Sequence, residues 1–160
     1  MKVWVDADAA PADVKAIVAR AALRLELETL LVANRRLQTP ANNPFVQAVV
    51  VAGGPDVADD HIAAHAMPGD LAITADIPLA ARLVDKGVHT IDPRGDEYTR
   101  ESIGERLSIR DFMDQLRSTG VETGGPSGYG QKDKQAFAGA LDRTLTRLLR
   151  ADRRPSPETP

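Results

Sequence analysis

Short apolar runs alternate with amphipathic stretches over residues 1–91. Runs rich in Val, Ile and Leu are typical of strands buried on both faces, whereas apolar residues spaced three and four positions apart predict helices. Turns at Gly and Pro separate the two kinds of segment. The predicted strands are residues 2–5, 29–33, 46–51, 71–74 and 88–91, and the predicted helices are residues 11–24, 56–66, 78–86, 103–118 and 134–150.

This alternation predicts an α/β fold. We expect an open parallel sheet of about five strands with helices on both faces, in a Rossmann-like three-layer arrangement, followed by C-terminal helices. Residues 1–150 are predicted to form a single domain. The glycine-rich segment 120–130 predicts a mobile loop, and the proline-rich end of the chain predicts a disordered tail over residues 151–160.

Composition excludes several kinds of chemistry. The 160-residue chain has no cysteine, which excludes disulfides, thiolate zinc sites and a Cys nucleophile. It has no apolar run of the ~18 residues that a membrane helix needs, and its first residues do not resemble a signal peptide, so we expect a cytoplasmic protein. The net charge of −3 argues against a tight duplex-DNA binder but allows an enzyme that touches a few phosphates.

Aspartates follow three of the predicted strands. Asp6 and Asp8 end the first strand, Asp56 and Asp59 follow the third, and Asp76 follows the fourth. Because the carboxyl ends of parallel strands meet at one edge of a sheet, these carboxylates are predicted to share a crevice. Carboxylates ~4 Å apart repel by ~4 kcal/mol at an effective dielectric near 20, so they must be protonated or neutralised by a cation. An all-oxygen site suits Mg²⁺ or Mn²⁺.

Helix capping is the alternative explanation for the same residues. Asp is a favoured N-cap, contributing ~1 kcal/mol, and Asp8, Asp56 and Asp76 each precede a predicted helix. For any single aspartate the two explanations are about equally good. The convergence of several aspartates is what favours a site.

Several motifs resemble the YaiI/YqxD family of bacterial proteins. The resemblance covers about residues 3–142, and the chain has Ala10 where that family usually has Cys. The matching motifs are Asp6-Ala7-Asp8-Ala9-Ala10-Pro11, Val32-Ala33-Asn34, Gly54-Pro55-Asp56-Val57-Ala58-Asp59, Gly69-Asp70-Leu71-Ala72-Ile73-Thr74-Ala75-Asp76-Ile77-Pro78, Pro93-Arg94-Gly95, Arg110-Asp111-Phe112-Met113 and Thr123-Gly124-Gly125-Pro126.

The family in turn resembles PIN and NYN nucleases. Those enzymes have an Asp after strand one, an acid at the start of a mid-chain helix, and a Thr-x-Asp after the next strand. Here Asp6, Asp59 (or Asp56) and the pair Thr74/Asp76 match those places. The resemblance implies a PIN-like domain that cleaves RNA with Mg²⁺ or Mn²⁺. In that interpretation the catalytic residues and metal ligands are Asp6, Asp56, Asp59 and Asp76, with Asp8 as a further ligand and Thr74 and Asn34 as supporting residues.

Basic residues near the crevice are candidates for phosphate contact. Arg35 and Arg36 follow the second strand, Arg110 lies on a later helix, and Lys132 lies in a segment that could close over a substrate. A solvated arginine pair and a flexible connector explain these features equally well.

Two other functions remain open from the sequence. A non-catalytic RNA-binding or adaptor protein could retain the acidic crevice as a structural metal site. A phosphatase using Asp6-x-Asp8 would also need a downstream lysine, for which Lys86 is a poor match. His61 and His65 have zinc-compatible spacing but lack the Glu of HExxH, so an ordinary helix face is the better interpretation.

Overall fold

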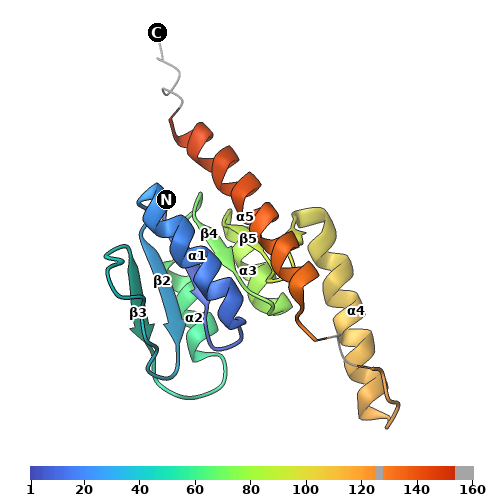
Figure 1. The fold of residues 1–160 in the computed structure, drawn as a ribbon. Helices are drawn as coiled ribbons and strands as arrows, with labels where there is room; N and C mark the ends of the chain where they lie inside the picture. The colour runs from blue at the N-terminus through green and yellow to red at the C-terminus, as the bar shows by residue number, and fades with distance from the viewer. Residues whose placement is uncertain (125–127, 154–160) are drawn as a thin grey trace.

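A computed structural model describes residues 1–124 and 128–153 (Figure 1). In chain order, the elements are β1 (Val3–Asp6), α1 (Ala12–Leu25), β2 (Thr29–Ala33), β3 (Val46–Val50), α2 (Val57–His65), β4 (Leu71–Ile73), α3 (Ile77–Lys86), β5 (His89–Ile91), β6 (Glu97–Tyr98), α4 (Arg100–Ser118) and α5 (Gln131–Asp152). None of the helices within these residues is both long and apolar enough to span a membrane.

The predicted open parallel sheet is confirmed. Its strand order is β3-β2-β1-β4-β5-β6, and all neighbouring pairs are parallel except β5 and β6. The chain moves outward from β1 to β2 and β3 on one side, and then returns to β4 and β5 on the other. The topological switch point therefore lies between β1 and β4. The antiparallel sixth strand was not predicted, because a two-residue strand leaves no hydrophobic pattern.

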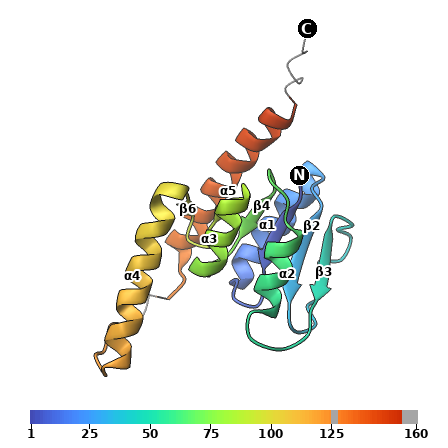
Figure 2. The ribbon, with the colours of Figure 1, turned by 180° about the vertical axis from the view of Figure 1, so that it is seen from behind.

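Alternate residues of the central strands enter two separate cores. Val3 and Val5 of β1 pack in the core with α1 and α5, whereas Trp4 packs in the core with α2 and α3. Figure 1 shows α1 and α5 covering one face of the sheet, and Figure 2 shows α2 and α3 covering the other. The predicted three-layer arrangement follows from this alternation.

A buried carboxylate fixes β1 against β4 at the amino edge of the sheet. Asp70 is 6% exposed and accepts hydrogen bonds from the backbone N–H of Lys2 and Met67 and from Trp4 Nε1. Three donors to one carboxylate offset the loss of hydration on burial. Asp70 therefore has a structural role and lies at the edge opposite the predicted crevice.

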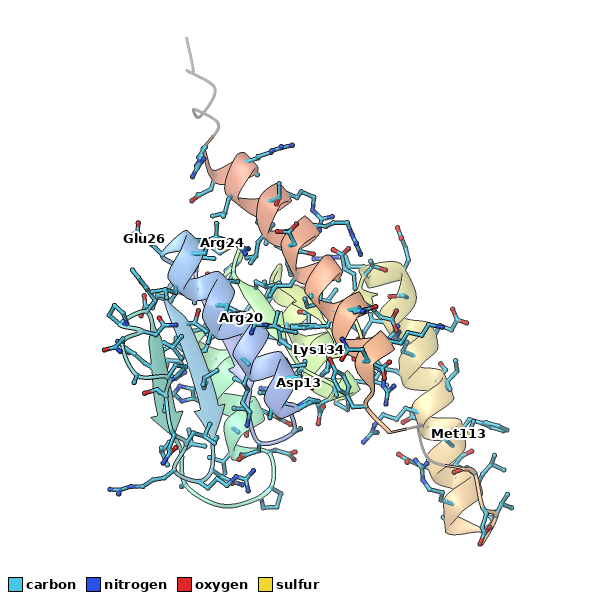
Figure 3. The ribbon with its side chains drawn as sticks, in the orientation of Figure 1. Asp13, Arg20, Arg24, Glu26, Met113 and Lys134 are labelled. Atoms are coloured by element: carbon cyan, nitrogen blue, oxygen red, sulfur yellow. The ribbon has the colours of Figure 1, made fainter. Side chains whose placement is uncertain are left out.

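The helix α5 closes the molecule over α1. Phe137, Leu141 and Leu145 of α5 are buried in the same core as α1. At the rim, Lys134 Nζ lies 3.7 Å from Asp13 Oδ1, and Figure 3 labels both side chains where the two helices come together. The helix continues to Asp152, so the first residues of the predicted tail are helical. Residues 154–160 of that tail, and residues 125–127 of the predicted loop, lie outside the described residues.

Within the described residues, the first half of α4 packs on the rest of the fold. Thr99 caps this helix, with its hydroxyl accepting from the Ser102 N–H at 3.0 Å, and Ile103 packs against the small core between α3 and β6. The second half extends away from the sheet in both views (Figures 1 and 2). Ile109 and Phe112 are 51% and 57% exposed there.

Gly95 is required by a close backbone approach. Its φ is +94°, and a Cβ would lie 2.7 Å from the Ala136 carbonyl oxygen. We expect Gly95→Ala to lower the free energy of unfolding by about 2–3 kcal/mol, from backbone strain plus overlap with α5. Gly104→Ala, in an open helical position, should instead raise it by about 0.5–1 kcal/mol. Urea unfolding of both variants checks this, and equal midpoints would contradict the role given to Gly95.

Candidate functional site

Asp6 and Thr74 meet across the switch point of the sheet. Asp6 is the last residue of β1, and Thr74 directly follows β4. Both are buried, at 7% and 2% exposure. The Thr74 hydroxyl donates a 3.1 Å hydrogen bond to Asp6 Oδ2 and accepts a 3.0 Å hydrogen bond from the backbone N–H of Asp76. Thr74 therefore orients the Asp6 carboxylate and links it to the start of α3.

Asp59 and Asp76 reach the same edge from two helices. Asp59 lies in the first turn of α2, and Asp76 is the N-cap of α3. Burial raises the pKa of Asp59 to about 6, and the negative charges of Asp76 and Asp6 and a hydrogen bond with the Asp76 side chain add to the rise. Such coupling requires the carboxylates to be close together. We call Asp6, Asp59 and Asp76 the acidic cluster.

Asp8 and Asp56 flank this cluster. Burial raises the pKa of Asp6 even though the Thr74 hydrogen bond opposes the rise, and the charges of Asp76 and Asp8 raise it further. The charge of Asp56 contributes in the same direction to Asp59. All five predicted aspartates thus belong to one electrostatically connected group at the carboxyl edge.

The capping explanation holds for one of the three aspartates. Asp76 Oδ1 accepts a 2.9 Å hydrogen bond from the Leu79 N–H, so it caps α3. Asp56 precedes α2 in a left-handed conformation, with φ 62°, and makes no side-chain cap. Asp8 does not cap α1, which begins after Pro11. Capping alone therefore does not account for the convergence of the aspartates.

Asp8 instead joins the segments that leave β1 and β2. Its Oδ2 accepts a 2.7 Å hydrogen bond from the Asn34 backbone N–H, which is the contact that Asn34 makes with the site. Its Oδ1 lies 3.5 Å from Arg35 Nε. That oxygen is buried, and it accepts no hydrogen bond within the described residues. Arg35 therefore lies beside the acidic group, as its position after β2 predicted.

A hollow of about 280 Å³ opens beside the cluster between α2, α3 and α4. Arg110 of α4 lines it, as does Arg82 of α3, whose Nη1 lies 2.7 Å from Asp60 Oδ1. The positions of Arg82 and Asp60 beside the hollow were not predicted, because their proximity depends on how α2 packs against α3, which no local sequence pattern indicates. The lining residues are Asp56, Asp59, Asp60, Asp76, Pro78, Leu79, Arg82 and Arg110.

The remaining predicted basic residues lie outside this hollow. Arg36 is exposed after β2. Lys132 is exposed in the first turn of α5, and within the described residues it makes no contact with the acidic cluster. Lys86, the lysine considered for a phosphatase, donates from its Nζ to the carbonyl oxygens of Ala63 and Ala64 near the end of α2. That position is away from the strand ends, and nothing in it favours a phosphatase.

His61 and His65 form a stacked pair on α2. Their ring centroids are 4.1 Å apart, and His65 Nδ1 lies 2.8 Å from the His61 carbonyl oxygen. Burial and the neighbouring His65 lower the pKa of His61. These contacts explain the spacing of the two histidines by helix-surface packing, next to Trp4, whose ring centroid is 6.3 Å from that of His61.

The donors of the acidic cluster are carboxylate oxygens. Within residues 1–124 and 128–153, no three or more His, Cys, Asp or Glu side chains are arranged as a ligand set for one metal ion. Mg²⁺ commonly keeps several waters and uses one or two carboxylates plus substrate phosphates, so it does not need such a cage. The crowded charges of Asp59 and Asp76 fit this mode of binding.

The fold and the strand-end carboxylates define a doubly wound α/β protein with an acidic crevice at its switch point. The chain belongs to a family of bacterial proteins whose sequence model, "Uncharacterized BCR, YaiI/YqxD family", matches residues 4–147. This confirms the resemblance seen in the motifs.

Relatives named UPF0178 protein match nearly the whole chain. The protein of Myxococcus xanthus is 56% identical, covering 95% of this chain and 99% of its own length. The protein of Geobacter sulfurreducens is 55% identical, with coverage of 94% and 99%. That of Dechloromonas aromatica is 51% identical, with coverage of 92% and 98%. No solved structure matches the chain.

The raised pKa of Asp59 makes stability depend on pH. Its folded-state pKa, about 6, exceeds the ordinary value of 3.8. The stability it contributes is therefore complete below pH 4 and is lost as pH rises through 6. We expect Asp59→Asn to raise the melting temperature of the metal-free protein at pH 8 by about 2–4 °C. The corresponding gain in the free energy of unfolding is roughly 1 kcal/mol. It is small because solvent screens the charge of this half-buried group.

The gain should shrink towards pH 4, where both side chains are neutral. Asp85→Asn, at an exposed position on α3, should change the melting temperature little at either pH. Calorimetry in EDTA measures both variants. A wild-type protein as stable as Asp59→Asn at pH 8 would show that the carboxylates do not repel each other appreciably.

Proposed function

We propose that this protein hydrolyses RNA phosphodiester bonds with Mg²⁺ or Mn²⁺ bound at the acidic cluster. The observation that carries the proposal is the crowding of Asp6, Asp59 and Asp76 at the switch point of the sheet. A cation relieves this repulsion, whereas a purely structural role leaves it without compensation. The places of Asp6, Asp59 and Asp76 are also those that the resemblance to PIN and NYN nucleases implies.

Basic side chains next to the cluster support a polyanionic substrate. Arg110 and Arg82 line the adjoining hollow, and Arg35 lies on the other side, beside Asp8. Guanidinium groups bind phosphate oxygens in a bidentate manner. The ion pairs of Arg110 with Asp114 and of Arg82 with Asp60 are exposed, so exchanging these partners for phosphate is inexpensive. The Arg35 side chain is also exposed, beside Asp8.

Each residue then has a definite task. When bound, a divalent cation supplies a more acidic water and offsets charge on the phosphate. Asp59 and Asp76 would hold this cation at the mouth of the crevice. Asp6, oriented by Thr74, would add negative charge from the buried side. Arg110 binds a phosphate of the substrate.

Cleavage of RNA tests the proposal. Single-stranded, hairpin and duplex RNAs are incubated with EDTA, Mg²⁺ or Mn²⁺, and cleavage is expected only with a metal. Asp6→Asn and Asp76→Asn should each slow cleavage at least a hundredfold. Because both act at one centre, the double variant should be about as inactive as either single variant. Asn at position 76 keeps the cap of α3, so the loss is not one of folding.

Two further variants separate binding from turnover. Arg35→Ala should weaken RNA binding with a smaller effect on the rate at saturation. Asp85→Asn, on the same helix as Asp76 but distant along it, should cleave like the wild type. RNA binding without cleavage, unaffected by either Asp6→Asn or Asp76→Asn, would support the adaptor function and reject the nuclease.

A further inference from the structure

A larger hollow lies on the α1 face of the sheet. Its volume is about 570 Å³, within the range of small-molecule sites. Its floor is Leu31 of β2, which is 4% exposed, and one wall is the first two turns of α1. The other wall is the segment that follows β2. The lining residues are Ala12, Lys15, Ala16, Leu31, Leu37, Gln38, Thr39, Pro40 and Ala41. We call it the α1 cavity.

The α1 cavity and the acidic cluster lie on two sides of Asp8. The negative charge of Asp8 raises the pKa of Asp6 in the cluster. Asp8 Oδ2 also accepts a hydrogen bond from the N–H of Asn34, which precedes the segment 37–41 that forms one wall of the cavity. The opposite wall, α1, starts at Ala12, shortly after Asp8. A linear polymer bound across Asp8 and Arg35 would therefore reach both the α1 cavity and the acidic cluster.

The lining combines apolar walls with polar groups at the rim. Ala12 and Ala16, one helical turn apart, leave room beside Leu31 and Leu37. Lys15 is half-buried at the rim and forms no ion pair with a described residue. Residues 36–42 make no hydrogen bond within the described part of the chain, so the backbone donors and acceptors of the wall are open to a ligand. A flat apolar body with polar edges and an attached anion matches this lining.

The hollow continues along α1. A second hollow of about 280 Å³ shares Ala16, Pro40 and Ala41 with it and extends to Arg20 and Leu23. The two together form a groove with a cationic residue in each part. A groove made of two adjoining hollows suits a strand of several nucleotides better than a single small metabolite.

We propose that the α1 cavity binds a nucleobase of single-stranded RNA, with the adjoining phosphate at Lys15. The proposal deepens the nuclease function and rests on it for the identity of the substrate. The base fills the space beside Ala16 and Leu31, and its polar edge meets the backbone of residues 38–41. The strand continues one way past Arg20 and the other way over Arg35 to the acidic cluster.

Binding in the absence of metal tests the cavity by itself. The probes are AMP, GMP, CMP and UMP, and fluorescein-labelled single-stranded hexanucleotides of A and of U, all measured in EDTA by calorimetry or anisotropy. We expect the hexanucleotides to bind at least tenfold more tightly than the mononucleotides. Ala16→Leu fills the cavity and should weaken hexanucleotide binding at least tenfold. Lys15→Gln should weaken it severalfold and reduce its salt dependence.

Matched controls identify the cause of any loss. Ala64→Leu makes the same change at an exposed position on α2 and should leave binding unchanged. Thermal melting of Ala16→Leu should match the wild type, because Ala16 is exposed. If that variant is unstable, Ala12→Leu fills the same space from the preceding turn.

The outcomes for the cavity and for the nuclease are distinct. No binding of any probe at millimolar concentration, or equal binding by wild type, Ala16→Leu and Ala12→Leu, would overturn the α1 cavity as a base site. Hexanucleotide binding that Ala16→Leu removes and Asp76→Asn leaves intact supports it. The same binding without RNA cleavage in Mn²⁺ would leave the base site standing and reject the nuclease.

Discussion

The fold depends on burying β1 on both faces and along both edges. Val3 and Val5 face one core and Trp4 the other, while β2 and β4 occupy the two edges. A parallel strand in this position requires helices above and below the sheet, which forces the connections to leave in opposite directions. The switch point between β1 and β4 follows directly. The carboxyl end of β1 is then a crevice that neither connection covers, and Asp6 stands in it.

This geometry brings several carboxylates together at the carboxyl edge of the sheet, where burial limits their hydration. Asp6 is buried, and Asp59 and Asp76 approach it from helices on the same face of the sheet. Burial, together with the repulsion between these carboxylates, raises the pKa of Asp59 to about 6. Asp70, at the other edge, is equally buried but receives three hydrogen bonds. Asp70 therefore stabilises the fold, whereas the repulsion within the acidic cluster costs stability. Ionisable residues whose arrangement lowers the stability of the fold commonly belong to functional sites.

Local patterns and one topological rule were enough to predict the central strands, their helices and the convergence of Asp6, Asp59 and Asp76. The carboxyl ends of parallel strands must meet, whichever strands they are. What could not be predicted depends on tertiary packing between separate segments: Arg82 beside Asp60, the approach of Gly95 to α5, and the α1 cavity. Lys132 was predicted to lie in a segment that could close over a substrate, but the structure places it in the first turn of α5. The two-residue β6 is fixed by its partner β5 rather than by its own sequence.

Under the proposed function, the charge of the cluster also sets an order of binding. An RNA phosphate approaching Asp59 and Asp76 would meet two negative charges, so its affinity for the crevice would be low until a cation is present. By linkage, the phosphate in turn favours the cation by the same factor. The α1 cavity, with Lys15 and Arg20 along its groove, carries no such penalty, and Asp8 pairs with Arg35 between the two places. A strand held first in that groove would present its phosphate to the cluster at high local concentration. Its arrival there would complete the coordination of a metal that two carboxylates alone would hold weakly.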